Sequence, residues 1–269
     1  MIKISELYIY PVKSLAGIQL SSSHLCPTGL KNDRRWMIID EQGQFMSQRE
    51  FAIMATIKTL FEGNQLVLTH EQDRIKVPQV NSNNKIKATV WKDTLFASHI
   101  CKSVDEWLTA KLHKKCQLVY MENNDNRQID RDYANHEQYV SFADAFPVLV
   151  ISQASLDDLN ERLDNPININ RFRPNMVVVG TDAFAEDHWQ DISINGTDFK
   201  AVKMCSRCIM PSINQETGKQ DQLKMLATLN KYRKFDQKIK FGQNLIYKDA
   251  KLIDNQLISC GDEINLKNI

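Results

Sequence analysis

The sequence predicts a β-rich α+β protein built of two β-barrel-like domains, at residues 1–121 and 122–269. Three observations support this fold class. Short segments of alternating apolar and polar residues are separated by turns rich in Gly, Pro and Asn, as in antiparallel β structure. The stretch at 122–137, ENNDNRQIDRDYANHE, is almost free of aliphatic residues and predicts an exposed linker or loop between the domains. No glycine fingerprint follows an early strand, which argues against a doubly wound Rossmann sheet.

The first domain is expected to consist of short strands and one helix. The predicted strands are Ile2 to Tyr10, Arg35 to Asp40, Gln65 to His70 and Lys87 to Ser98. The segment from Ser103 to Glu106 has the form of a capping box and precedes apolar residues at helical spacing. A helix is therefore predicted from Ser103 to about His113.

The second domain is expected to combine strands with two helices. Its predicted strands are Phe146 to Ile151, Met176 to Gly180, Ile192 to Ile194, Phe199 to Met204, Gln243 to Tyr247 and Gln256 to Leu266, and its predicted helices are Ala154 to Leu163 and Gln222 to Lys234. Asn195 and Gly196 lie between two of these strands, where a type I′ hairpin turn suits both residue types.

Length and charge limit the possible classes of function. The 269 residues, 42% of them hydrophobic, can bury one large core or two smaller ones. The 34 Lys and Arg nearly balance the 33 Asp and Glu, so no overall field attracts nucleic acid or an anionic membrane, and an anion site must be local. The sequence has neither a signal-peptide pattern nor an apolar run of about 18 residues, so a cytoplasmic protein without a membrane partner is expected.

The segment MCSRCI places Cys205 and Cys208 on either side of a Ser and an Arg. A zinc site needs four ligands, and neither a second CxxC nor a paired His accompanies this one. A redox disulfide would normally lie at a helix N-terminus, whereas here a strand precedes the cysteines and Pro211 follows. A thiolate bound to a soft metal and a pair of buried structural cysteines also fit. The tetrapeptide alone leaves these four interpretations open.

Three basic motifs lie beside predicted strands, where loops gather. Lys13 and Ser14 follow the first strand in YPVKS, Arg34 lies in DRRW, and Arg173 and Asn175 precede a buried strand in RFRPN. Prolines make two of these turns rigid. Each motif alone is most simply a solvated surface charge, but together they predict a fixed anion site.

The segment FAEDHW carries an acidic pair, Glu186 and Asp187, between aromatic residues. Such a pair can act as a general acid and base. Carboxylates beside buried rings are more often local caps or partners of arginines, and this is the role expected here.

Taken in order, the motifs make the sequence similar to the MOSC family, the molybdenum cofactor sulfurase C-terminal domain preceded by an N-terminal β-barrel domain. The resemblance covers nearly the whole chain, through YPVKSLAG, GLKNDRRWMIID, SQRE, SFADAFPVLVIS, RFRPNMVVVG, FAEDHW, CSRCIMP and FGQNLIY. Within the family the sequence most resembles the bacterial YcbX-type proteins and the mitochondrial amidoxime reducing component, which bind the molybdenum cofactor and reduce N-hydroxylated compounds.

The resemblance implies a role for each matching residue. Cys208 would be the molybdenum ligand and the catalytic residue, and Cys205 would be structural. The implied cofactor-binding residues are Lys13, Ser14, Arg34, Arg173, Asn175, Ser206 and Arg207. Ala145 and Phe146 replace hydroxyl residues of the mitochondrial relatives, so backbone contacts would have to replace side-chain contacts there. The turn NQETG at 214–218 also lacks the proline that is usual in the family.

The function implied by the resemblance is that of a molybdenum-cofactor (molybdopterin) oxidoreductase acting on small N-hydroxylated substrates. YcbX-type proteins usually continue into a ferredoxin domain, whereas only Cys260 lies near the end of this sequence. An external electron-transfer protein, a flavin or iron–sulfur reductase, is therefore expected as partner. The alternative is a molybdenum cofactor carrier or a sulfur-transfer protein with a persulfide on Cys208. A third possibility is a β-barrel interaction module in which the motifs are family relics.

Overall fold

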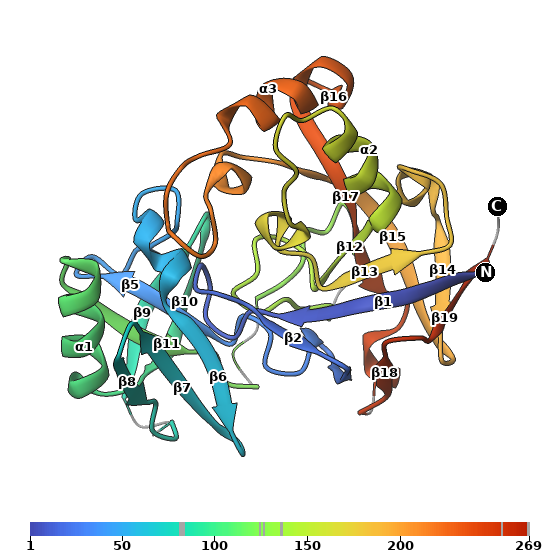
Figure 1. Cartoon of the computed structure of the whole chain (residues 1–269). Coiled ribbons are helices and arrows are strands. Elements are labelled where there is room, and N and C mark those ends of the chain that lie inside the picture. The colour runs from blue at the N-terminus through green and yellow to red at the C-terminus, as the bar shows by residue number, and fades with distance from the viewer. Residues whose placement is uncertain (81–83, 124, 126, 135–136, 254, 268–269) are drawn as a thin grey trace.

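The largest element of the fold is a closed β-barrel of seven strands (Figure 1). The fold is taken from a computed structural model that describes residues 1–269 apart from 81–83, 124, 126, 135–136, 254 and 268–269. In barrel order the strands are β12 (Val148–Ser152), β13 (Met176–Val179), β1 (Ile2–Ile9), β19 (Glu263–Lys267), β14 (Asp191–Ile194), β15 (Thr197–Ser206) and β17 (Lys238–Tyr247). The barrel closes because β17 pairs with β12. The predicted β-rich α+β class is confirmed.

The first strand of the chain belongs to this barrel. β1 pairs with β13 on one side and with β19 on the other, so that Leu7 lies opposite Met176 and Ile2 opposite Ile264. Two short strands extend the sheet, β2 (Ile18–Leu20) beside β1 and β16 (Lys234–Phe235) beside β17. The two ends of the described chain therefore lie side by side (Figure 1).

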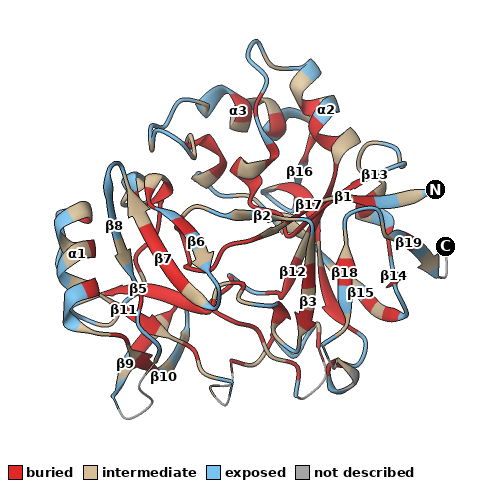
Figure 2. Cartoon of the chain, turned by 60° about the horizontal axis from the view of Figure 1, so that its bottom comes forward, coloured by how far each residue is buried: buried red, intermediate tan, exposed pale blue. Residues whose placement is uncertain are grey.

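Apolar side chains from the strands fill the barrel interior. In β1, Ile4, Leu7 and Ile9 are buried, and the alternation shifts by one residue after Ile4, where the pairing with β13 is irregular. The rings of Phe199 and Tyr247 lie 5.0 Å apart within the same core. Figure 2 shows buried residues along the barrel strands. This filled interior leaves the loops, rather than the lumen, to build a site.

A second β-rich part lies beside the barrel and includes the only α-helix of the described N-terminal half. One sheet has the order β5 (Trp36–Asp40), β11 (Cys116–Tyr120), β10 (Asp93–His99) and β9 (Lys85–Val90), and another the order β6 (Lys58–Glu62), β7 (Gln65–His70) and β8 (Asp73–Lys76). Helix α1 (Lys102–Leu112) packs on this part through Val104, Leu108 and Leu112. A small sheet of β3 (Ser22–Cys26), β4 (Gly29–Leu30) and β18 (Leu257–Ser259) joins the N-terminal third to the C-terminal segment.

Two further helices pack near one side of the barrel. They are α2 (Gln153–Glu161) and α3 (Leu223–Tyr232), and the short 3₁₀ helices are η1 (Ala52–Thr56), η2 (Ile169–Phe172), η3 (Ala185–His188), η4 (Met210–Ser212) and η5 (Ala250–Leu252). Leu156 and Leu159 of α2 share a core with Met225 and Leu229 of α3. Both predicted helices are confirmed, with shifts of one to two residues at their ends. No helix in the described part of the chain is long and apolar enough to cross a membrane.

Two local predictions need correction, and a third is supported. Residues Lys87 to Ser98 do not form one strand, because the chain turns at Trp91 and β9 pairs with β10 as a hairpin. The capping box is absent: α1 begins at Lys102, its N-cap makes no side-chain hydrogen bond, and Glu106 instead pairs with Lys102. The type I′ turn is supported by positive φ angles of 47° at Asn195 and 80° at Gly196.

The expected exposed linker at 122–137 is also only partly correct. Within its described residues, Arg127 is 6% exposed, Ile129 2% and Ala134 8%. Ile129 and Ala134 pack against Phe146 in a small apolar cluster. The segment therefore carries buried anchors between its polar residues, and Arg127 is one of them.

Candidate functional site

A cavity of about 150 Å³ lies where loops of the two parts meet. All eight residues predicted for the site line it: Lys13 and Ser14 after β1, Arg34 before β5, Arg173 and Asn175 before β13, and Ser206, Arg207 and Cys208 at and after the end of β15. The fold thus brings four separate sequence motifs together. The role of each residue stays a prediction.

Two arginines of the cavity form no ion pair with any carboxylate in the described part of the chain. Arg173 is 8% exposed and donates to a backbone carbonyl at 2.7 Å. Arg207 donates to the carbonyl oxygen of Phe172 at 2.7 Å and to the sulfur of Cys205 at 3.1 Å. Burial, with a smaller contribution from Arg34, lowers the pKa of Arg173 to about 10. Arg173 therefore stays charged at neutral pH, and neither guanidinium has a carboxylate partner among the described residues, so this wall of the cavity favours an anion.

Two other cations of the cavity are already paired. Lys13 Nζ lies 2.6 Å from a carboxylate oxygen of Asp144 and donates to the carbonyl oxygen of Phe142 at 2.8 Å. Arg34 forms an ion pair with the buried Asp33. Burial lowers the pKa of Lys13 to about 8, although Asp144 acts in the opposite direction. Lys13 is therefore charged at neutral pH but loses its charge at mildly alkaline pH.

Two of the cavity arginines, Arg34 and Arg173, are held in place by neighbouring side chains, those of Tyr10 and Asn175. The guanidinium carbons of Arg34 and Arg173 lie 4.3 Å and 4.1 Å from the centre of the Tyr10 ring. Arg34 also donates to the side-chain oxygen of Asn175 at 3.1 Å. Cation–π contacts and hydrogen bonds fix the two guanidinium groups before any ligand arrives.

Three of the predicted residues have left-handed backbone conformations. The φ angles are 68° at Ser14, 48° at Arg34 and 55° at Arg173. Residues other than Gly adopt this region at a cost of about 1–3 kcal/mol, and such residues cluster at functional sites. The backbone of three separate loops is thus held in unfavourable conformations around one cavity.

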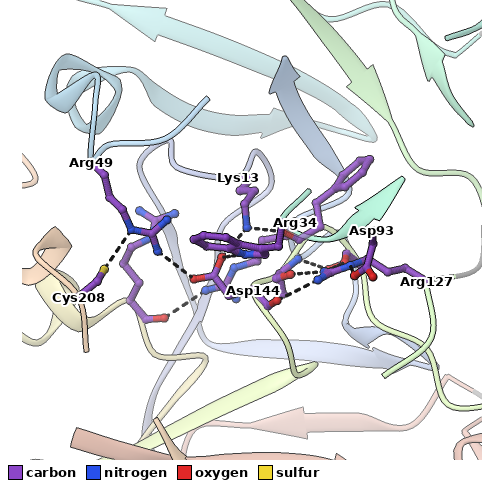
Figure 3. Close-up of polar contacts among 12 residues, drawn as sticks. Lys13, Arg34, Arg49, Asp93, Arg127, Asp144 and Cys208 are labelled. Carbon is purple, nitrogen blue, oxygen red and sulfur yellow. Dashed lines mark hydrogen bonds and ion pairs between the residues drawn. The ribbon is translucent and has the colours of Figure 1, made fainter. Parts of the chain in front are cut away.

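The two thiols of the CxxC motif have different surroundings. Cys208 is exposed, and Nε of Arg49 donates to its sulfur at 3.3 Å (Figure 3). Cys205 is less exposed and accepts from Arg207 instead. Both cysteines are free thiols. The asymmetry that the sequence alone could not decide is thus present in the structure: Cys208 lies open at the cavity, and Cys205 lies behind Arg207.

Arg49 and Asp144 belong to the site although they were not among its predicted residues. Arg49 connects Cys208 to Asp144, with 3.7 Å between its guanidinium nitrogen and the carboxylate (Figure 3). Asp144 in turn holds Lys13. Both residues lie inside motifs of the resemblance, SQRE and SFADAF, and that was the available signal.

Arg127 holds the backbone of the loop at 141–144, which carries Asp144. Its guanidinium donates to the carbonyl oxygen of Ser141 at 3.0 Å, to that of Ala143, and to that of Asp144 at 2.9 Å. Its Nε lies 2.8 Å from a carboxylate oxygen of Asp93, which balances the buried charge (Figure 3). Arg127 therefore fixes the backbone that presents Asp144 to Lys13.

The two departures from the family pattern can now be placed. Ala145 and Phe146 both line the cavity, and neither side chain offers a hydrogen-bonding group. In the turn at 214–218, the side-chain oxygen of Gln215 accepts from Gln48 at 3.2 Å and lies 3.4 Å from a nitrogen of Arg173. This unusual turn thus reaches the site from behind the arginine.

Glu186 and Asp187 lie outside the cavity. Glu186 is fully buried and accepts from the backbone of Ser152 and the hydroxyl of Ser155. Asp187 forms an ion pair with Arg233. These contacts agree with the expectation that the two carboxylates serve as local partners.

The fold and the cavity define a protein of two β-rich parts whose loops build a cationic site beside an exposed thiol. The MOSC domain model matches residues 137–265, and the model of the MOSC N-terminal beta barrel domain matches residues 1–115. The chain belongs to the MOSC family.

The chain is similar to two animal proteins. Mitochondrial amidoxime reducing component 2 of Bos taurus is 31% identical over 260 residues, covering 93% of this chain and 76% of the relative. Mitochondrial amidoxime-reducing component 1 of Homo sapiens is 28% identical, covering 98% of this chain and 82% of the relative. Among solved structures, the YUAD protein of Bacillus subtilis is 14% identical with a TM-score of 0.46, covering 98% of this chain and 94% of that chain.

Proposed function

We propose that this protein binds the molybdenum cofactor and reduces N-hydroxylated compounds with electrons from a separate redox protein. The observation that carries the proposal is the cavity lined by all eight residues that the MOSC resemblance implies. The names of the relatives, amidoxime reducing components, support the reaction class. A flavin or iron–sulfur electron donor and a cytoplasmic location are parts of the same proposal.

The donor groups of the cavity fit the phosphate and pterin of this cofactor. A phosphate group carries a charge of about −1.5 to −2, and Arg173 and Arg207 offer two positive charges without carboxylate partners in the described chain. Nε of Arg207 is buried and has no hydrogen-bond partner among the described residues, so it can still donate to a ligand. Ser14 and Ser206 offer hydroxyl groups that can donate and accept at a pterin ring edge. The Asn175 side chain already accepts from Arg34 and from the backbone of Leu149 and donates to the carbonyl oxygen of Tyr8, which leaves its second amide N–H for a ligand.

Cys208 is the proposed metal ligand because it is the exposed thiol of the motif. When bound, the cofactor supplies a molybdenum centre for two-electron chemistry at the N–O bond. Arg49 donates to the Cys208 sulfur. A thiolate is the form of cysteine that binds metals.

Asp144 organises the cations of this site and does not deliver a proton. The protein around it would raise the pKa of its carboxyl group, but Lys13 and Arg49 hold that pKa well below its usual range. Asp144 therefore stays ionised at neutral pH. Its charge orients Lys13 toward the cofactor cavity and Arg49 toward Cys208.

The decisive test compares Cys208→Ser with Cys205→Ser in protein purified from cells that make the cofactor. A chemically reduced viologen dye supplies electrons, so no natural donor is needed. Cys208→Ser is expected to lower turnover of an N-hydroxylated substrate by at least about 100-fold, since it removes the metal ligand. Pterin content should persist because the phosphate donors remain. Cys205→Ser should retain most of the activity.

Full turnover in Cys208→Ser would remove the basis of the proposal. A wild-type protein that contains molybdenum and pterin, yet reduces no N-hydroxylated compound with the dye, would favour the cofactor carrier or sulfur-transfer alternative. A protein without metal or pterin from the same cells would favour an interaction module.

A further inference from the structure

A second cavity, of about 720 Å³, adjoins the site and shares Phe45, Ser47, Arg49 and Cys208 with the first. Of the described residues that line it, Cys208 alone belongs to the proposed cofactor set. A cofactor in the first cavity would therefore leave Cys208 approachable from the second. The volume lies within the range of about 300–1,000 Å³ that is common for small-molecule sites.

Trp91 forms part of this cavity wall in a conformation that its own turn does not favour. It lies between β9 and β10 with a φ angle of 55°, a left-handed conformation that is rare for a bulky residue. Asn or Gly would suit such a hairpin turn better. The Trp91 side chain is also 45% exposed, so burial does not account for its presence.

The exposed ring of Trp91 is nevertheless held in place. Its Nε1 donates to a carboxylate oxygen of Asp144 at 3.3 Å, and its ring centre lies 4.8 Å from that of Phe45. The guanidinium carbon of Arg49 lies 4.5 Å from the Trp91 ring centre, while the Nε of Arg49 reaches Cys208. Trp91, Arg49 and the Cys208 sulfur are thus connected by successive contacts along one wall of the cavity.

The charges around the second cavity compensate one another. Its described lining has two acidic residues, Asp40 and Glu50, and two basic residues, Arg49 and Lys114, so their formal charges cancel. Glu50 and Lys114 are exposed and of opposite sign. The cavity therefore offers no net charge for an ionic ligand, and its aromatic rings favour a planar one.

We infer that the second cavity is the substrate site and that Trp91, with Phe45, stacks an uncharged, conjugated group whose N–OH then lies beside Cys208. This inference rests on the proposed function and adds the substrate class and a specificity-determining residue to it. A flat conjugated substrate gains stacking contacts that a small aliphatic one lacks. Trp91 therefore discriminates between substrates without taking part in the reaction.

The test compares benzamidoxime with acetamidoxime, an aromatic and an aliphatic N-hydroxyamidine, in cofactor-loaded protein with the reduced viologen dye. Trp91→Leu is expected to raise the ratio of the KM for benzamidoxime to the KM for acetamidoxime by about threefold to tenfold. Trp91→Phe keeps a ring and should largely keep the preference. Phe96→Leu is the matched control, because Phe96 is 64% exposed on β10 and lines neither cavity.

Binding is measured independently through tryptophan fluorescence. Trp36 and Trp189 are buried, and the half-buried Trp107 lines neither cavity. Trp91 is exposed at the second cavity, so benzamidoxime should quench wild-type emission saturably. The quenching should be lost in Trp91→Phe although that variant still turns over.

The two readouts separate the failure of this inference from failure of the proposed function. Reduction of both compounds with an unchanged KM ratio in Trp91→Leu would overturn the inference and leave the reductase proposal standing. Quenching of the same size in Trp91→Phe would also overturn it. Saturable quenching that depends on Trp91, without reduction of either compound, would support the binding site and sink the reductase proposal.

Discussion

Arg233 and Arg173 are almost equally buried, 5% and 8% exposed, yet their charges are balanced in different ways. Arg233 forms an ion pair with the buried Asp187 and stacks on Phe184. Arg173 has only carbonyl and amide oxygens as acceptors among the described residues. Arg127 and Arg171 resemble Arg233, since each has a carboxylate partner.

This difference separates arginines whose charge is paired with a carboxylate inside the fold from cavity arginines whose charge remains available to an external anion. An ion pair inside the protein offsets the cost of burying its two charges, but it leaves no unpaired positive charge for an external anion. A buried guanidinium without a carboxylate keeps that cost until an anion arrives. Arg173 and Arg207 lie in the cavity, whereas Arg35, which is also buried without a carboxylate partner among the described residues, donates to Met121 and Asn123 outside it. A missing carboxylate partner therefore indicates function only together with a place in the cavity.

The largest effect is expected from breaking a structural pair. Arg233→Met leaves Asp187 buried without its counter-charge and should lower the free energy of unfolding by about 3–5 kcal/mol. Denaturant unfolding monitored by circular dichroism measures the change. The double variant Arg233→Met/Asp187→Leu should recover most of the loss. No loss in the single variant would contradict the structural role.

A smaller effect, of a different kind, is expected at Arg173. Arg173→Met leaves no carboxylate unpaired in the described chain, so the free energy of unfolding should change by less than about 2 kcal/mol. Cofactor retention should fall about 10–100-fold, because a charged hydrogen bond is worth about 1.5–3 kcal/mol. Pterin content after gel filtration measures retention. Unchanged cofactor retention together with a marked loss of folding stability would show that Arg173 has a structural role like that of Arg233.

The smallest effect is expected from pH, through Lys13. With a pKa of about 8 in the folded protein, Lys13 loses its charge between pH 7 and 9, and cofactor retention should fall by up to about tenfold. Lys13→Arg should flatten this dependence, because the guanidinium stays charged. A pH profile that is the same in both proteins would exclude Lys13 as its cause.

The effect of Lys13 on folding has the opposite sign. Its pKa is lower in the folded chain than the ordinary value of 10.5, so between about pH 8 and 10.5 the unfolded state binds more protons. The contribution of Lys13 to the free energy of unfolding therefore rises with pH in that window. Cofactor loss at pH 9 without lower stability would distinguish weakened anion binding from unfolding.

The sequence predicted the elements and motifs that depend on local patterns. The strand alternation of Ile2 to Tyr10, the N–G turn at Asn195 and the helix before Leu163 all follow from neighbouring residues, and the structure contains them. The hairpin at Trp91 was missed because Trp91 and Lys92 are not turn-forming residues. The indole nitrogen of Trp91 instead donates to Asp144, which lies far along the chain.

The site shows the same division. Lys13, Arg34 and Cys208 were found because their motifs are distinctive in sequence. Arg127 was missed because its acceptors are backbone carbonyls, which leave no trace in the sequence. The difference between a paired and an unpaired arginine is likewise invisible there, since the carboxylate partners of Arg127 and Arg233 lie 34 and 46 positions away.

The place of β1 in the barrel has a practical consequence. The MOSC domain match begins at residue 137, but β1 fills the gap between β13 and β19. A fragment limited to the matched region would expose the edges of both strands, with their apolar inner faces beside them. Open edges of this kind recruit strands from other molecules. Such a fragment is expected to aggregate, and adding residues 1–9 as a separate peptide should suppress the aggregation.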